Sequence, residues 1–567
     1  MNIITGLILG LTDVFSWEKI VHLFTYNEGE PMIFTQFFFW GFFAVVLFVY
    51  SFVYKRQGLR NAFLFFVSLF FYYKTSGLFI TILLFSTLTD FALGQLIYSA
   101  NKKNIKQLFV AISVTINLLV LGYFKYAYFF TESFNNFFHT NYEMFNHFAK
   151  WTNDTMGTHF EVNRILLPVG ISFFTFQTIS YSIDVYRGHI KPVRNILDFG
   201  FYVSFFPQLV AGPIVRAADF IPQLYKPYKL TQHQFGLALF WILKGLAKKV
   251  IIGDYIAVNF IDRVFGNPSM FTGFENLMAL YGYSLQVYAD FSGYTDIAIG
   301  IALLMGFTLP KNFNSPYKAK NVGEFWKRWH ISLSSWLKDY LYIPLGGNRG
   351  GSIGTWIALF FIIGFIVLLS GSMIVLYSIL GLILFSVLLA LWVKPFRAWL
   401  TTNINLLITM LLGGLWHGAS WQFVIWGGLN GLGIIVYKLW RKVSPYEKLN
   451  NVLGVVIKIF VTFNFITFTR IWFRAENIED TWLIIDQIKN SFSAELIPEI
   501  VSSYSNVFIM MLIGFVIHWL PVKVKDWYRE TFIAFPLAVK IVVSAVVIFG
   551  VYQAMSSDLQ AFIYFQF

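Results

Sequence analysis

The sequence contains no cysteine. This absence excludes disulfide bridges, thiolate nucleophiles and thiolate metal ligands. Charged residues are also scarce, at 13% of the chain, about half of the share that is usual in soluble domains. The chain further lacks a G-x-S-x-G nucleophile elbow, a P-loop and a dinucleotide-binding fingerprint, which excludes the sequence signals of many hydrolases and nucleotide-binding folds.

Apolar residues are abundant instead. They make up 57% of the 567 residues, the mean hydropathy is +0.63, and apolar runs long enough to span a bilayer recur along the chain. We therefore expect an all-α polytopic membrane protein with roughly 11–13 transmembrane and re-entrant helices. The expected organisation is one integral membrane domain over 1–567, with peripheral N-terminal helices (1–160), a core (161–445) and C-terminal helices with an aromatic tail (446–567).

The distribution of charge predicts a topology. The net charge of +13 is too scattered for a nucleic-acid-binding surface, and it fits cytoplasmic loops together with a site for an anionic ligand. Placing the basic clusters inside and the acidic stretches outside leaves the C-terminus outside the cytoplasm. The predicted spans are 34–54, 107–130, 166–186, 451–472, 505–521 and 533–552, with an apolar stretch that leaves and returns between 62 and 100.

One stretch, residues 324–350, combines aromatic and basic residues at helical spacing. Read as a single helix, it carries tryptophans and leucines on one face and charged residues on the other, and it ends before the glycine-rich turn at 346–351. His330 falls on the apolar face. Such a basic amphipathic helix lies at a membrane interface or lines a cavity between spans, so His330 is either a functional imidazole or an interfacial one.

A second candidate is His417, which lies between the apolar runs 404–415 and 422–437. The neighbouring Gly413 and Gly414 permit close approach of backbone or substrate. An ionisable residue at membrane depth indicates function, although a packing histidine bonded to a carbonyl is the alternative. Two histidines without cysteine suit general-base chemistry on a hydroxyl. Neither has a second histidine or a carboxylate at ligand spacing, so no metal site is expected.

Charged residues in the middle third allow two interpretations. Asp290 and Asp296 stand in an apolar setting, where either could orient a histidine, pair with Arg216, or belong to a structural ion pair. Basic residues near 311–349 could bind the phosphates of an anionic donor or simply be solvated loop residues. The candidate phosphate-binding residues are Lys327, Arg328, Arg349 and Arg216.

Several of these motifs together resemble the membrane-bound O-acyltransferase family, in its bacterial alginate O-acetylation branch. The resemblance rests on the run 325–334, on the run 339–349 and on Leu415-Trp416-His417-Gly418. The runs around Pro207-Gln208, 290–294 and 172–177 and the terminal Phe-Ile-Tyr-Phe-Gln-Phe add to it. It covers roughly 165–440 and the tail, whereas the remaining segments match only in hydropathy.

This resemblance implies a helical bundle around a tunnel in a bacterial plasma (inner) membrane. A cytosolic acetyl-CoA would donate the acetyl group, and an exported cell-surface polysaccharide would accept it with the help of a separate extracytoplasmic acetyltransferase. His417 would be the catalytic histidine and His330 the second histidine in the tunnel. Tyr564, in the C-terminal motif, would be a possible acyl relay, with an aromatic anchor residue as the alternative.

Two other functions stay open at this point. Within the same family, a D-alanyl carrier protein could be the donor and teichoic acid the acceptor. In a different class, the buried histidines could relay protons in a transporter or lipid flippase. The absence of two matched sequence halves disfavours the transporter.

Overall fold

The computed structural model describes residues 21–555, except 22, 28, 157–160, 163, 211, 371–372 and 450. All regular elements within this part of the chain are helices, which confirms the predicted fold class. Seven of them are long and apolar enough to cross a membrane. They are Gln57–Ser99, Lys103–Phe138, Gly273–Leu304, Pro395–His417, Trp421–Val443, Val452–Arg474 and Leu537–Ala554.

The expected spans 107–130, 451–472 and 533–552 each correspond to one of these helices. Two further expected spans, 34–54 and 166–186, correspond to the shorter helices α3 (Phe37–Val53) and α9 (Ile171–Arg187), which have 17 residues each. The predicted span 505–521 corresponds to α25 (Ser505–Trp519), which meets the preceding α24 (Ile497–Ser503) at an angle of 89°. The stretch 57–99 is helical along its length, but it is divided into two helices at Gly77, where a φ of +60° ends α4.

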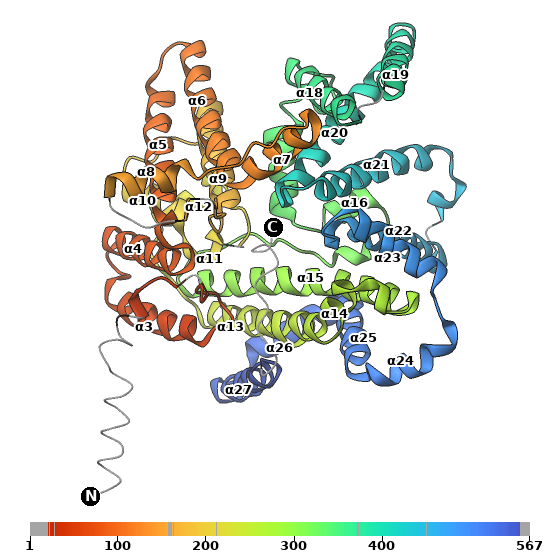
Figure 1. The fold of residues 1–567 in the computed structure, drawn as a ribbon. Helices are drawn as coiled ribbons and strands as arrows, with labels where there is room; N and C mark the ends of the chain where they lie inside the picture. Colours follow the sequence, from red (N-terminus) through yellow and green to blue (C-terminus); the bar gives the residue numbers. More distant parts are fainter. Residues whose placement is uncertain are drawn as a thin grey trace, which may run out of the picture. The chain divides into compact units, whose positions relative to one another are not determined.

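Contacts divide the chain into two compact units that alternate along the sequence. The first contains residues 1–121, 167–230 and 302–308, and the second contains 122–166, 231–301 and 309–567. The predicted boundaries at 160 and 445 stay a prediction. The helices of the first unit (Figure 1) are α3 (Phe37–Val53), α4 (Gln57–Ser76), η1 (Gly77–Phe79), α5 (Ile80–Ser99), α6 (Lys103–Leu121), α9 (Ile171–Arg187), α10 (Ile196–Ser204), α11 (Phe206–Leu209) and α12 (Ala217–Leu224).

In the first unit, α9 packs against α5 and α6. A polar cluster holds these three helices together around the buried carboxyl group of Asp90 on α5. Ser113 and Asn117 of α6 and Ser182 of α9 all donate hydrogen bonds to it, at 2.7 Å from Asn117 and 3.1 Å from Ser182. Ser182, a polar residue of the 167–188 stretch, therefore serves packing here, because a buried polar group needs a partner.

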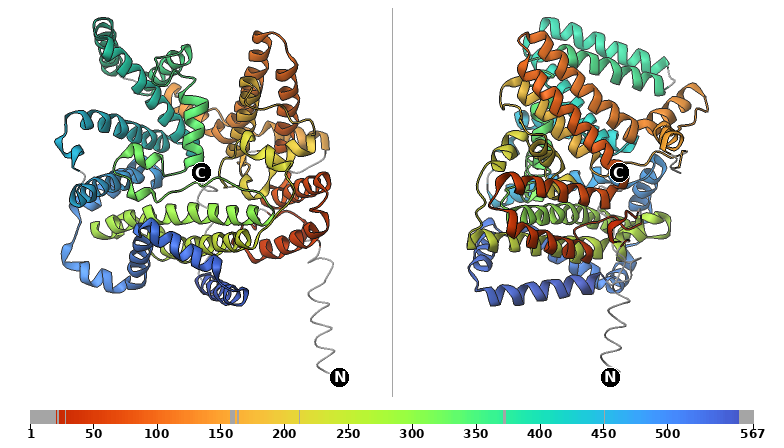
Figure 2. Two further views of the ribbon diagram at one scale, coloured as in Figure 1. Left: turned by 180° about the vertical axis from the view of Figure 1, so that it is seen from behind. Right: turned by 90° about the vertical axis from the view of Figure 1, so that its left-hand side faces the viewer.

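The second unit is built on α15 (Gly273–Leu304), a helix of 32 residues whose most apolar part is 89% buried. Gly245 on α13 and Gly293 on α15 bring the two helices into backbone contact: a Cβ atom at Gly245 would lie 2.5 Å from the Gly293 carbonyl oxygen. α13 and α15 lie side by side in both orientations of the ribbon (Figures 1 and 2). This close crossing fixes one wall of the unit.

The remaining helices belong to the second unit, apart from the last turn of α15. In sequence order they are η2 (Gly122–Tyr126), α7 (Ala127–Phe138), α8 (His147–Met156), α13 (Gln232–Leu246), η3 (Ala247–Asp254), η4 (Ala257–Ile261), α14 (Asp262–Gly266), η5 (Pro268–Met270), α15 (Gly273–Leu304), η6 (Pro316–Lys318), α16 (Val322–Trp326), α17 (Ile331–Leu337), η7 (Lys338–Tyr342), α18 (Ile353–Ser370), α19 (Met373–Trp392), α20 (Lys394–His417), α21 (Trp421–Val443), η8 (Pro445–Lys448), α22 (Val452–Arg474), α23 (Ile478–Asn490), η9 (Ala494–Leu496), α24 (Ile497–Ser503), α25 (Ser505–Trp519), α26 (Val522–Ala534) and α27 (Leu537–Ala554).

The cluster around Asp90 gives a test of this packing. Asp90→Ala leaves the donors of Ser113, Asn117 and Ser182 without their acceptor in a buried place, which should destabilise the protein by about 1–3 kcal/mol. Thermal unfolding of the purified protein in detergent should show a lower Tm. Ser99→Ala, at the exposed end of the same helix, is the control; an equal Tm for both variants would contradict the structural role of Asp90.

Candidate active site

His330 lies at a break between two short helices, α16 and α17, and not within one helix. Its backbone is in the left-handed region, with φ of +43° and ψ of +56°, which a continuous helix does not allow. The prediction of a single amphipathic helix over the 324–343 part of the stretch was therefore wrong. The prediction that His330 faces inward is confirmed, because the side chain is 0% exposed.

The break is stabilised by Asn312, which precedes the stretch by 18 residues. Its side-chain oxygen lies 3.2 Å from Nδ1 of His330 and accepts hydrogen bonds from the backbone N–H and the hydroxyl group of Ser332. Its backbone carbonyl accepts the N–H of Ile331. Asn312 thus caps the start of α17 and holds the imidazole at the same time.

His417 is the last residue of α20 and is 3% exposed. Gly418 follows in an extended conformation and ends the helix. Gly414 on α20 and Gly427 on α21 bring the two helices into backbone contact: a Cβ atom at Gly414 would lie 2.2 Å from the Phe423 carbonyl oxygen, and one at Gly427 would lie 2.3 Å from the Met410 carbonyl oxygen. The close crossing of α20 and α21 therefore fixes the position of His417.

The two predicted histidines meet in the second unit. Their ring centroids are 6.4 Å apart, although the residues come from different elements. Aromatic rings surround both. Phe291 of α15 packs at 4.7 Å against His330, and Trp426 of α21 and Phe473 of α22 pack at 5.0 and 5.5 Å against His417. Such a surrounding excludes water, which suits a reaction that hydrolysis would otherwise intercept.

Lys125 was not predicted from the sequence. It lies on η2, a π-helical turn inside the helix that runs from 103 to 138, and its Nζ donates 2.6 Å and 3.4 Å hydrogen bonds to the carbonyl oxygens of Trp416 and His417. The neighbouring Tyr126 donates a hydrogen bond of 3.0 Å to the carbonyl of Leu415. These two side chains satisfy carbonyl groups at the C-terminus of α20, where the partial negative charge favours a cation. π-turns of this kind are frequent at functional sites.

Arg470 and His518 were also missed, because both stand in runs that the sequence identifies only as apolar spans. Arg470 lies 4.6 Å from the ring centroid of Trp329 and donates a hydrogen bond to the hydroxyl group of Tyr317. His518 accepts the backbone N–H of Tyr317 at 3.2 Å. Both side chains are buried and support the segment that leads into α16.

Asp290 and Asp296 form ion pairs with lysines of the same unit. Oδ1 of Asp290 is 2.6 Å from Nζ of Lys249, and Oδ2 of Asp296 is 2.5 Å from Nζ of Lys248 and 3.2 Å from Nζ of Lys244. These pairs correspond to the structural alternative of a buried ion pair between helices.

The phosphate-binding role of Lys327, Arg328, Arg349 and Arg216 stays a prediction. Arg328 pairs with Glu324, at 2.8 Å from its Nη2, and also donates to the carbonyl of Asn314. Lys327 and Arg349 are exposed. Arg216 belongs to the first unit, where it is the N-cap residue of α12. Tyr564 lies outside the described residues, and among the described residues no group of three or more His, Asp or Glu side chains could hold a metal ion.

The model of the family described as "MBOAT, membrane-bound O-acyltransferase family" matches residues 69–366, more than half of the chain. The chain belongs to the membrane-bound O-acyltransferase family. The matched segment contains His330, Asn312 and Lys125 and ends before His417.

Three relatives illustrate the range of the similarity. The chain is 37% identical over 377 residues to a probable alginate O-acetylase of Pseudomonas aeruginosa, which covers 66% of this chain and 59% of the relative. It is 33% identical over 444 residues to a peptidoglycan O-acetyltransferase of Helicobacter pylori, a match that covers 74% of this chain and 71% of the relative. It is 27% identical over 318 residues to a teichoic acid D-alanyltransferase of Bacillus subtilis, a match that covers 55% of this chain and 69% of the relative. The chain thus spans 59% of the length of the alginate O-acetylase that it matches.

In this member of the membrane-bound O-acyltransferase family, the arrangement of the two imidazoles suits proton transfer to and from a hydroxyl group. His330 is held by a carboxamide, and His417 is fixed through its backbone. The imidazole of His330 lies beside the carboxamide of Asn312 and aromatic rings, which suits a base or hydrogen-bond donor of fixed orientation.

Lys125 is expected to act as a positioning residue for His417. Lys125→Met removes the ammonium group from the end of α20 and should lower kcat for acyl transfer roughly 10- to 100-fold with little change in KM, because small displacements of a catalytic group are costly. Kinetics in proteoliposomes measure both constants. Lys125→Arg should restore part of the rate.

The control for this test is Lys150→Met, which replaces an exposed lysine of the same unit and should leave both constants unchanged. A Lys125→Met variant that unfolds at a lower temperature but keeps its kcat would contradict the positioning role.

Proposed function

We propose that the protein is a membrane O-acetyltransferase that moves an acetyl group from cytosolic acetyl-CoA to an exported cell-surface polysaccharide. The observation that carries this proposal is the meeting of His330 and His417, 6.4 Å between ring centroids, in a buried aromatic site of a membrane-bound O-acyltransferase. The identities of 37% and 33% to alginate and peptidoglycan O-acetyl-transferring relatives support acetyl as the group and a glycan as the acceptor. In this proposal, the protein is a multi-pass protein of the bacterial plasma membrane.

In the proposed reaction, His417 is the general base. The acceptor hydroxyl oxygen attacks the carbonyl carbon of the acetyl thioester while its proton passes to the His417 imidazole. The new C–O bond forms, the C–S bond breaks, and the proton then passes to the departing sulfur, which leaves the acetyl ester and the free CoA thiol. His330, held by Asn312, assists from the second side of the site.

Tyr564 is the proposed acyl relay on the outer side. Its hydroxyl would be the first acceptor in the reaction above. A separate extracytoplasmic acetyltransferase would then transfer the acetyl group from Tyr564 to the polysaccharide. The charge-based topology, which places the C-terminus outside the cytoplasm, supports this role.

Label transfer tests the function. Purified protein in proteoliposomes, with radiolabelled acetyl-CoA on the cytosolic side, should become labelled, and the label should be lost in His417→Ala and in Tyr564→Phe. His330→Ala should reduce the rate, because general acid–base groups typically contribute about 10²–10⁴-fold. His147→Ala, an exposed histidine, is the control and should behave as the native protein.

Label that persists in Tyr564→Phe with unchanged acetyl transfer would retire the relay and leave the base assignment in place. Equal donor consumption by His417→Ala and native protein would contradict the site. A preference for D-alanyl carrier protein over acetyl-CoA would instead favour the activity of the teichoic acid D-alanyltransferase relative.

A further inference from the structure

Arg470 is a buried arginine within the candidate membrane span Val452–Arg474, and its side chain is 2% exposed. A guanidinium group carries several N–H donors. In Arg470, Nη2 donates a 3.2 Å hydrogen bond to the hydroxyl group of Tyr317, and Cζ lies 4.6 Å from the ring centroid of Trp329. In the part of the chain that the structure describes, Nε has no hydrogen-bond partner and no carboxylate lies within ion-pair distance of the guanidinium. These contacts compensate only part of its charge.

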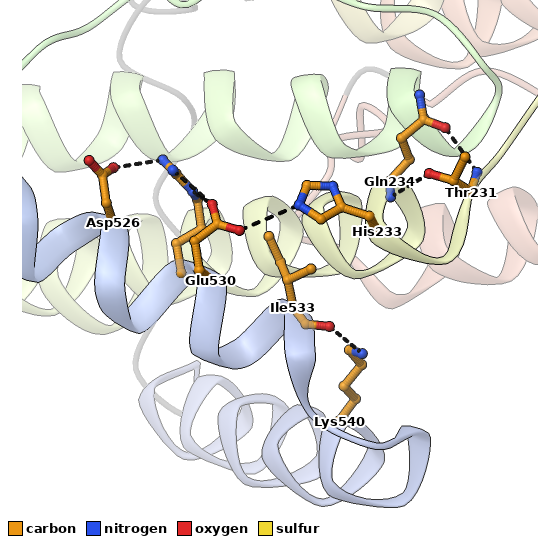
Figure 3. Close-up of polar contacts among 8 residues, drawn as sticks. Thr231, His233, Gln234, Asp526, Glu530, Ile533 and Lys540 are labelled. Carbon is orange, nitrogen blue, oxygen red and sulfur yellow. Dashed lines mark hydrogen bonds and ion pairs between the residues drawn. The ribbon is translucent and has the colours of Figure 1, made fainter.

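Other buried cations of this protein are compensated more fully. Lys249 has carboxylate oxygens of two aspartates at 2.6 and 2.7 Å. Arg60 donates hydrogen bonds through each of its three nitrogens. Lys540 donates to two backbone carbonyl groups, and Figure 3 shows it directed at that of Ile533, 2.8 Å away. Because a buried charge is costly unless it is paired, the partly compensated Arg470 indicates a function.

The position of Arg470 relates it to both histidines. Trp329, whose ring the guanidinium contacts, directly precedes His330. Phe473 lies one helical turn after Arg470 on α22, and its ring packs at 5.5 Å against the imidazole of His417. The positive charge of Arg470 is also close enough to interact with the His417 imidazole. The guanidinium group therefore belongs to the surroundings of the histidine pair.

Acyl transfer creates a negative charge that neither imidazole is assigned to stabilise. When the acceptor hydroxyl oxygen attacks the acetyl carbon, the former carbonyl oxygen becomes an oxyanion and the proton passes to His417. When the C–S bond breaks, the carbonyl group forms again and the sulfur takes the proton. Fixed donors directed at such an oxyanion are commonly the largest single contribution to catalysis. An arginine keeps its proton throughout the reaction, so it supplies positive charge without entering the proton transfer.

We infer that the guanidinium group of Arg470 donates hydrogen bonds to the acetyl carbonyl oxygen and stabilises the oxyanion. The inference rests on the proposed function and adds a catalytic residue to it. Tyr317 and Trp329 hold the guanidinium from two sides, and the Tyr317 hydroxyl group itself donates to the carbonyl of Ser284. The charge is therefore held in place before a substrate binds, as an oxyanion site requires.

Kinetics of the full chain in proteoliposomes, with acetyl-CoA as donor, test this inference. Arg470→Met should lower kcat roughly 10²–10³-fold with little change in KM, because the lost contact is strongest in the transition state. Arg470→Lys should keep part of the rate. The matched control is Arg474→Met, on the same helix, which removes a half-buried guanidinium that lies 3.5 Å from Asp262. It should keep the native kcat.

A second donor separates an oxyanion contact from a structural role. In the dithioester analogue of acetyl-CoA, sulfur replaces the carbonyl oxygen and accepts hydrogen bonds only weakly. The native protein should therefore prefer the oxygen donor, and Arg470→Met should reduce this oxygen-to-sulfur rate ratio about tenfold. A purely structural defect would slow both donors equally. Arg474→Met should show the native ratio.

A native rate or a native oxygen-to-sulfur ratio in Arg470→Met would overturn the inference, while acetyl transfer by the native protein would leave the proposed function in place. If Arg470→Met does not fold, Arg470→Lys decides, because it keeps the buried charge: a reduced ratio supports the oxyanion contact and a native ratio contradicts it. Native protein that transfers no acetyl group from acetyl-CoA, with acceptor and partner supplied, would contradict the proposed function itself.

Discussion

The side chain of Asn312 is the constraint on which the candidate site depends. Its oxygen accepts hydrogen bonds from the N–H and hydroxyl groups of Ser332 and faces Nδ1 of His330. One carboxamide therefore starts α17, keeps His330 in a left-handed backbone conformation and orients its imidazole. Such a conformation is unfavourable for a residue with a Cβ atom and persists only where its surroundings hold it. The same residue lines a cavity of about 310 Å³ together with Lys311 and Lys525, so the cavity wall and the histidine share one support.

The other supports follow from the cost of burying polar groups in a membrane protein. The carbonyl groups at the end of α20 receive hydrogen bonds from Lys125 and Tyr126, and the guanidinium group of Arg470 is placed over Trp329. Each interaction satisfies a group that lipid could not solvate. In doing so it also fixes a residue next to one of the two histidines. The same contacts therefore serve both stability and the geometry of the candidate site.

The sequence predicts the helical membrane fold and the burial of both histidines, because those depend on local hydropathy and periodicity. It does not predict the break at His330, whose cause is Asn312, 18 residues earlier. Lys125 could not be found in this way either, since its partner Trp416 is 291 residues away. Arg470 and His518 are hidden inside apolar runs. The cavity lysines are dispersed from 244 to 525 and gather only in three dimensions.

A structure of the protein with a bound, non-hydrolysable acetyl thioester analogue of coenzyme A would test the central claim most directly. Electron cryomicroscopy in nanodiscs would locate the analogue. We predict density for its carbonyl group between the rings of His330 and His417, within hydrogen-bond reach of His417. A carbonyl group bound away from both imidazoles would contradict the assignment of this pair as the acyl-transfer site.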